Sequence, residues 1–333
     1  AGVQTVNRIS ETVRAYIDGD GSDGIRAASV ELTATDQSKI DAKAGAASIA
    51  AAIGTSGNAA VALSVAVALA ENTIHNRVES YIKGADGDGT ADATTGVGVK
   101  TTTGDITIQA FEKADIDAIA VAASIAAGIS GGTAGVAVSG AGAAATNVIV
   151  NGVNAYVQDS RVDGGNDVKL AAADDSSITA TIIAASVGVG VGSTAGVGSS
   201  IGASVAHNFI GYNADGSDAL SEVKAYIKES SVNAQGQLKL SADSKQVIDA
   251  IVVAGSAALA AGGTAGIAAS GAGVYAENLI AVDTKAYIDG DGQSGIQADN
   301  VLITADDSAA ISAVAGAASL AAALGGTAGA SVS

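Results

Sequence analysis

The sequence predicts an all-β protein in which one unit is repeated along a single continuous array, from residue 1 to residue 333. Three observations lead to this prediction. Proline is absent from the whole chain, apolar residues alternate with small ones at a period of two, and the same short landmarks return at intervals of 61 to 75 residues. Together they favour five tandem repeats of about 61 to 76 residues, stacked into a layered fibre.

The core has to be built from small and aliphatic side chains. The chain contains 44 Gly and 2 Phe, and it lacks Trp, Met and Cys. Without Cys, disulfide bonds and thiol chemistry are excluded. Because proline has no N–H to donate, its absence protects the continuous backbone ladders that long β-sheets require.

Five Asn residues, each followed two positions later by Ile, mark the approximate starts of the repeats. A Tyr comes nine residues after four of them, and 18 residues after the other, because GYNADGSDAL is inserted there. The Asn residues are Asn7, Asn72, Asn147, Asn208 and Asn278, and the Tyr residues are Tyr16, Tyr81, Tyr156, Tyr226 and Tyr287. We expect the Asn side chains to bond to one another along the stack. The Tyr rings are expected at an edge, with their hydroxyls in water.

The segments between these landmarks have the alternation of strands. Val61, Leu63 and Val65, for example, alternate with Ala62 and Ser64. The pentapeptide GGTAG stands at residues 131–135, 262–266 and 325–329, with GSTAG at 192–196 and GTSG at 54–57. We expect each repeat to be a long antiparallel hairpin with this element at its tip, where Gly supplies the positive φ of a tight turn. Ala-rich stretches also suit a helix, but the period of two argues against one.

Both faces of these arms are apolar or very small, so neither face is suited to water. We therefore expect each sheet to be covered on both faces. The Ala, Gly and Ser faces allow close stacking, and the Val, Ile and Leu faces pack at the usual sheet spacing of about 10 Å. The result is a layered β-structure, with a β-solenoid-like arrangement as the alternative.

The first and last repeats are incomplete and complementary. Residues 1–7 read AGVQTVN and residues 330–333 read ASVS. Joined, GTAGASVSAGVQTVN is one residue shorter than GTAGVAVSGAGAAATN inside the chain. Two explanations fit: the chain is a slice of a much longer repeat protein, or the next subunit's first strand completes its last hairpin and builds an open filament.

The charge balance limits the partners. The chain has 16 Lys and Arg against 34 Asp and Glu, a net charge of −18. This charge repels nucleic acid and anionic membranes, and it suits cations.

Asp/Gly-rich loops are the candidate metal sites. The Asp residues concerned are Asp18, Asp20, Asp23, Asp86, Asp88, Asp289 and Asp291. Carboxylates separated by Gly can converge on Ca²⁺, which prefers six to eight oxygen ligands. Asp-Gly is also the preferred pair for a plain turn, and the loops lack the closing Glu of an EF-hand. Both interpretations stay open, with the turn favoured.

Catalysis is not expected. The chain has two His residues, His75 and His207, and no repeated Ser/His/Asp arrangement. The Gly-rich segments stand at predicted hairpin tips, whereas a phosphate-binding loop needs a helix to follow it.

Three segments carry a resemblance to a known class of proteins. AENTIHNRVESYI, ATNVIVNGVNAYV and AENLIAVDTKAYIDGDG resemble the repeats of very large bacterial exoproteins, including leukotoxin-like and adhesin-like surface proteins. The resemblance covers essentially the whole chain, but it brings no functional residues with it. It implies an exported protein, extracellular or on the cell surface, with a mechanical or adhesive role.

The function expected from these observations is structural. The chain is predicted to form a self-associating extracellular filament, or the stalk of a giant surface protein, with copies of itself or further repeats as its partners. A membrane-inserting toxin with spanning β-hairpins is one alternative, although an Ala, Gly and Ser face would line a poor aqueous channel. A module that displays an adhesive insert at residues 211–220 is another.

Overall fold

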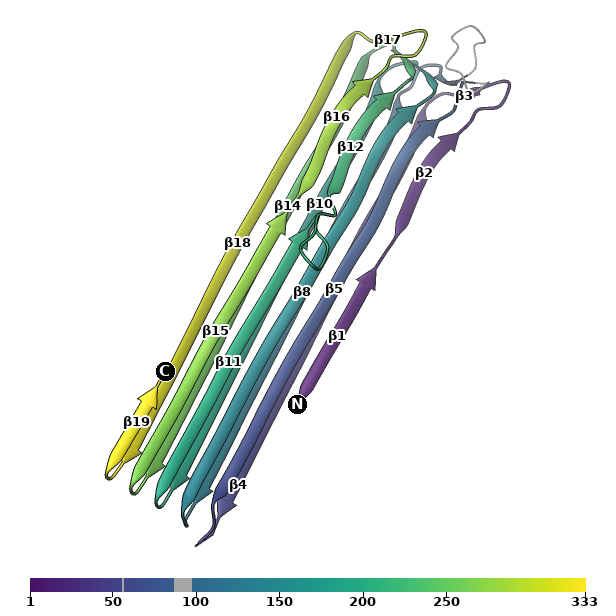
Figure 1. The fold of residues 1–333 in the computed structure, drawn as a ribbon. Coiled ribbons are helices and arrows are strands. Elements are labelled where there is room, and N and C mark those ends of the chain that lie inside the picture. Colours follow the sequence, from purple (N-terminus) through teal and green to yellow (C-terminus); the bar gives the residue numbers. More distant parts are fainter. Residues whose placement is uncertain (56, 87–97) are drawn as a thin grey trace.

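The computed structural model describes residues 1–55, 57–86 and 98–333 (Figure 1). Strands and their connecting loops account for all of these residues, and none of them lies in a helix. The all-β class predicted from the sequence is therefore confirmed.

The strands belong to three sheets. The outgoing sheet contains β4 (Val30–Gly54), β7 (Ile106–Ser130), β10 (Val168–Gly192), β14 (Gln237–Gly262) and β18 (Asn300–Gly325). The return sheet contains β1 (Gly2–Ile9), β2 (Thr12–Asp18), β5 (Ala60–Lys83), β8 (Ala134–Gln158), β11 (Ala195–Ile210), β12 (Ser221–Lys228), β15 (Ala265–Ile280), β16 (Val282–Asp289) and β19 (Ala328–Val332). The base sheet contains β3 (Ile25–Ala27), β6 (Val99–Thr101), β9 (Arg161–Gly164), β13 (Ser231–Ala234) and β17 (Ile296–Gln297).

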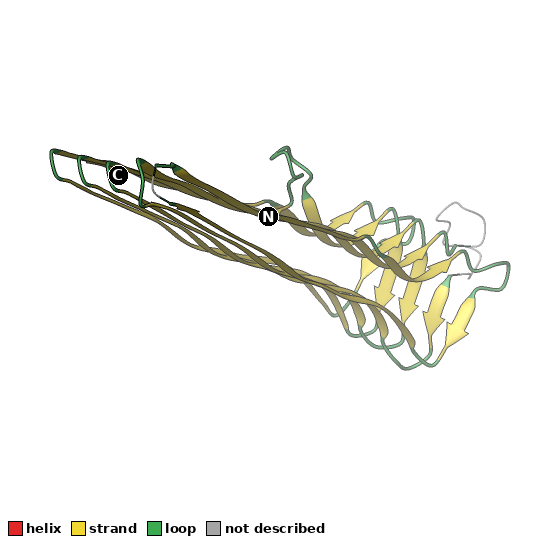
Figure 2. Cartoon of the chain, turned by 90° about the horizontal axis from the view of Figure 1, so that it is seen from below, coloured by secondary structure: helices red, strands yellow, loops and turns green. Residues whose placement is uncertain are grey.

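The molecule is a long blade. The outgoing and return sheets face each other along its length, and the base sheet lies at one end only (Figure 2). Each turn of the chain runs along an outgoing strand to the tip, back along the return sheet and through the base sheet. All ladders between the described strands are parallel. Parallel strands in stacked sheets make the fold β-solenoid-like, the alternative that the sequence left open.

The predicted antiparallel hairpins are wrong in their pairing. The two arms that meet at a tip run in opposite directions, but they are not hydrogen-bonded to each other. β7 pairs instead with β4 and β10, and β8 pairs with β5 and β11. The tips also bond from layer to layer, as in Ser193 N to Ser130 O at 3.2 Å. Each arm already uses its N–H and C=O groups on its neighbours above and below, so the tip is an arch between two sheets.

The role predicted for the tip glycines also needs correction. In the GGTAG and GSTAG tips none of the glycines has a positive φ, although Gly57 in the first tip does, at 92°. What these tips require is space. A Cβ atom at Gly196 would overlap the backbone of Ala261, and one at Gly266 would overlap the backbone of Leu324. Gly is needed there because the chain comes close to the facing sheet.

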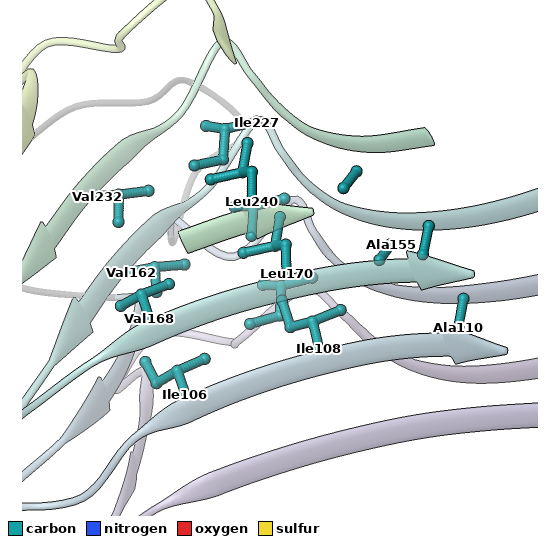
Figure 3. Packing of buried hydrophobic residues seen from close by; sticks show 14 of the residues in the cluster. Ile106, Ile108, Ala110, Ala155, Val162, Val168, Leu170, Ile227, Val232 and Leu240 are labelled. Carbon is teal, nitrogen blue, oxygen red and sulfur yellow. The ribbon is translucent and has the colours of Figure 1, made fainter. Parts of the chain in front are cut away.

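The core changes in character along the blade. At the base, aliphatic side chains from all three sheets meet, among them Ile108, Leu170, Val162 and Ile227 (Figure 3). Towards the tip the buried side chains between the two long sheets are mostly Ala. The space between the two long sheets therefore decreases from the base, where large side chains fill it, towards the tip, where Ala and then Gly fill it.

The larger aliphatic residues of the tip half point outward. Ile49 is 78% exposed, and Leu63 on the opposite side of the blade is 66% exposed. The expectation that both faces of each sheet are covered is therefore not met within one chain. The small residues pack inside because they allow the two sheets to approach each other, which leaves the larger ones on the surface.

The return sheet absorbs two irregularities. The insertion at residues 211–220 leaves the sheet between β11 and β12, after which β12 continues beside β8 with Glu222 opposite Gly152. The first and last return segments are partial: β1 lies opposite β5 from Val67 onward, and β19 lies opposite residues 265–269 of β15. These two segments occupy different stretches of the return strand.

Candidate functional site: two open edges and the ladders that reach them

The recurring Asn residues form one continuous ladder across the return sheet. Each Asn donates from Nδ2 to Oδ1 of the next, from Asn7 through Asn72, Asn147 and Asn208 to Asn278, and each of the four bonds measures 2.8 Å. The in-register pairing of the strands brings the five side chains together. The ladder has a direction, since among the described residues Asn7 Oδ1 has no donor and Asn278 Nδ2 has no acceptor at its two ends.

The five Tyr residues form a second stack beside the base. Successive ring centroids are 5.1, 4.7, 4.9 and 5.2 Å apart, and neighbouring rings are within 11° of parallel. Burial raises the pKa of Tyr156 to about 12 and also raises that of Tyr226. At one end of the stack Tyr16 is 54% exposed, because no ring covers its outer face.

The Asp/Gly loops form turns at the base. Three glycines in the first loop and three in the last have positive φ, between 60° and 77°. Among the described residues no three acidic or histidine side chains gather in a way that could hold a metal ion, and Asp88 lies outside those residues. The carboxylates of Asp18, Asp20, Asp23, Asp86, Asp289 and Asp291 are therefore not brought together as a site within one chain. Calcium binding stays a prediction.

A buried acidic column was missed in the sequence. In the outgoing sheet, Asp36, Glu112, Asp174, Ser244 and Asp307 occupy one register position. Glu112 and Asp174 are buried. The signal for them is their place in the alternation of the strand. Each acid lies two residues after an Ala whose side chain points inward, at Ala34, Ala110 and Ala172, so the acid points inward as well. This signal can be used only when it is known which face of the strand points inward.

Amide and hydroxyl groups of the facing sheet hold this column. Asn76 donates from Nδ2 to Asp36 at 2.6 Å and to Glu112 at 3.0 Å, and Asn151 donates to Asp174 at 3.4 Å. Burial, together with the negative charges of Asp36 and Asp174 and against the hydrogen bond from Asn76, raises the pKa of Glu112 to about 8. Burial also raises the pKa of Asp174 to about 6. Glu112 and Asp174 are therefore easiest to accommodate when their carboxyl groups are protonated.

The blade has two open edges where all three sheets stop together. The outgoing and base sheets end at β4 and β3 on one side and at β18 and β17 on the other, and the return sheet ends at the partial strands β1 and β2 on the first side and at β16 and β19 on the second. An edge strand leaves a row of unpaired N–H and C=O groups, which is a template for pairing with another chain. Here β4 and β18, of 25 and 26 residues, are long and regular.

At the β18 edge, a core position is left uncovered. Ile311 on β18 shares a register position with Ile40, Ile116, Ile178 and Ile248, which are buried. Ile311 itself is 50% exposed. The same register position is therefore a finished core inside the blade and an uncovered apolar side chain at its edge.

No helix among the described residues is long and apolar enough to cross a membrane. Comparisons with protein-family models, with curated proteins and with solved structures find no match to this chain.

Proposed function

We propose that the chain is a non-enzymatic building block of an extracellular, β-rich filament, or of the stalk of a giant surface protein. Further layers of the same fold, from copies of this chain or from repeats of the same polypeptide, add to the two open edges. The observation that carries this proposal is the directional match of the edges: the Asn ladder ends in a free acceptor at Asn7 and a free donor at Asn278.

The common register specifies how two copies meet. With β18 of one copy beside β4 of the next, Val301 lies opposite Val30 and Ile311 lies opposite Ile40, as in every internal layer. The Tyr stack continues in the same way from Tyr287 to Tyr16. The join satisfies a row of edge hydrogen bonds and buries apolar side chains, and strand addition of this kind is a common mode of assembly.

The return sheet accommodates the join without overlap. β19 lies beside the first residues of β15, whereas the β1 strand of a second copy would pair with β15 further along, opposite Gly273 and beyond. The two partial strands then share one layer. Because the junction repeats head to tail without closing a ring, it extends into a filament.

Electron microscopy combined with the denatured mass of the chain tests this proposal. We expect uniform fibres whose strands lie perpendicular to the fibre axis. Chains of about 32 kDa in these fibres indicate assembly from separate subunits, and far larger chains indicate a giant repeat protein. Compact particles of uniform size, together with leakage of dye from liposomes at low protein concentration, would overturn the proposal in favour of a membrane-active protein.

A pair of variants on β18 tests the edge itself. Ile311→Glu places a carboxylate in the core of the junction, and we expect it to abolish fibre growth, because burying an unpaired charge is strongly unfavourable. Val314→Glu is the matched control. Val314 is similarly exposed, at 59%, but it points outward and shares the register position of Lys43, so fibres should still form. Equal fibre growth by both variants contradicts the proposed junction.

A further inference from the structure

The outer surface of the outgoing sheet near the tip carries a broad face without polar side chains. On each of the five strands we take the five alternate outward positions nearest the tip, which on β7 run from Val121 to Ile129. Every one of them is Gly, Ala, Val, Ile or Leu. Ile49 and Leu324 on the two outer strands are 78% and 73% exposed. We call this surface the apolar face.

The apolar face is large for an exposed surface. The nine residues from the first to the last of these positions cover about 30 Å along a strand, and five strands cover about 24 Å across the sheet, so the area is roughly 700 Å². The largest apolar patch on an ordinary monomer is about 300–600 Å², and larger patches mark interaction sites. This area is comparable with the roughly 800 Å² that one partner contributes to a stable protein interface.

The relief of this face suits packing against a second sheet. One row across all five strands is small throughout: Ala47, Ala123, Ala185, Gly255 and Ala318. The adjacent row towards the tip is mostly large: Ile49, Ile125, Val187, Ala257 and Leu320. A hollow of about 320 Å³ lies where the two rows meet on β10, β14 and β18. When a second copy is turned by a two-fold rotation, its row of large side chains can pack into the row of small side chains of the first copy, and the reverse.

The charge distribution permits two copies to meet here in spite of the net charge of −18. The apolar face has no ionisable side chain, and the first one towards the base is Lys43. The Asp-rich loops lie at the other end of the blade. Like-charge repulsion between copies is therefore concentrated away from this surface.

Lipid suits the face less well than protein. Hydrocarbon would surround the unpaired backbone groups of β4 and β18, and backbone groups without a hydrogen-bond partner are strongly unfavourable in a bilayer. The opposite side of the blade is also less suitable as an interface. Its outward positions include the polar side chain of Ser199, which has no counterpart on the apolar face, and four glycines, Gly140, Gly142, Gly271 and Gly273, against three on the apolar face.

We propose that the apolar face binds the same face of a second copy of this chain, so that two blades pair laterally with their outgoing sheets about 10 Å apart. This pairing is separate from stacking on the open edges. Stacking sets the length of an assembly, whereas lateral pairing sets its width, so either interaction can fail without the other.

The test uses variants with one added charge on each side of the blade. Ile125→Glu adds a carboxylate to the apolar face, and Val138→Glu adds one to the outer surface of the return sheet. The two residues lie in adjacent elements of the chain and are 44% and 40% exposed. In fibres we expect Ile125→Glu to halve the mass per unit length measured by scanning transmission electron microscopy, while Val138→Glu leaves it unchanged.

A measurement without fibres separates lateral pairing from stacking. In the Ile311→Glu background, sedimentation should show a dimer that Ile125→Glu converts to a monomer. Ile49→Glu, at a largely exposed position on the edge strand, should do the same and guards against misfolding of the Ile125 variant. A monomer in the Ile311→Glu background, a loss of pairing with Val138→Glu alone, or flotation of the parent chain with phosphatidylcholine vesicles would each overturn the proposal.

Discussion

At the scale of single residues, Glu112 and Asp174 are the groups whose environment departs most from water. Both are buried in one column of the outgoing sheet, and Asp36 lies next to Glu112 in the same column. The Oε2 atom of Glu112 and the Oδ1 atom of Asn151 are buried acceptors without a hydrogen-bond partner among the described residues. A buried acceptor without a hydrogen-bond donor destabilises the folded chain. Protonation of Glu112 turns its carboxyl into a group that can donate a hydrogen bond.

This arrangement predicts that stability falls as the pH rises. The pKa of Glu112 is about 8 in the folded chain against 4.5 for an ordinary Glu, and that of Asp174 is about 6 against 3.8. A raised folded-state pKa contributes stability that is fully present below the unfolded value and is lost as the pH rises through the folded one. The free energy of unfolding should therefore decrease between about pH 4 and pH 8, by an amount on the order of a few kcal/mol.

Urea denaturation at a series of pH values measures this dependence. Glu112→Gln should make the free energy of unfolding less dependent on pH above pH 6, because the amide of Gln stays neutral without binding a proton. Asp249→Asn, at an exposed position on β14, is the control and should leave the curve unchanged. A stability that rises with pH in the parent chain would contradict the assignment.

At the scale of elements, the arches at the tip decide how closely the two long sheets approach. Gly196 and Gly266 at the tip face the backbone of the opposite sheet, whereas Gly255 on the outer face of β14 has no atom within 4 Å of the place where a Cβ would stand. The same residue type thus has two roles. Near the tip, the missing side chain lets two backbone segments approach each other. On the outer face, the missing side chain only leaves a shallow place in the surface.

Two alanine substitutions separate these roles. Gly196→Ala should destabilise the chain by roughly 1–3 kcal/mol, because the new methyl group collides with the backbone of Ala261. Gly255→Ala should be neutral or slightly stabilising, since it only reduces the freedom of the unfolded chain. Thermal denaturation of the two variants decides the matter, and equal losses would argue against close approach as the reason for glycine at the tip.

At the scale of the whole molecule, the two open edges carry a charge conflict at the base. One register position holds Lys83, Gln158 and Lys228 inside the blade, but Asp18 and Asp289 in the two end layers. A head-to-tail junction places these two carboxylates opposite each other. Like charges directly opposite in neighbouring strands are destabilising.

Fibre growth should therefore depend on cations. We expect growth, followed by light scattering, to accelerate with added NaCl and to respond to CaCl2 at much lower concentration, because a divalent ion screens two facing carboxylates more effectively. Asp289→Asn should weaken this dependence, and Asp215→Asn in the inserted loop, away from the junction, should not. Growth that is indifferent to salt and to a Ca²⁺ chelator would contradict this account of the junction.

The all-β class and the positions that lie side by side could both be predicted from the amino-acid sequence. The period of two argues against helices, and the absence of proline preserves the backbone donors. The Asn and Tyr landmarks also meet across the sheets in register. Only the tertiary structure decided which strands pair, because period-two alternation is the same in an antiparallel hairpin and in an arch between parallel sheets. It also decided which face is inside: the two sheets approach closely where Ala and Gly face each other, which leaves Ile49 outside and encloses Glu112.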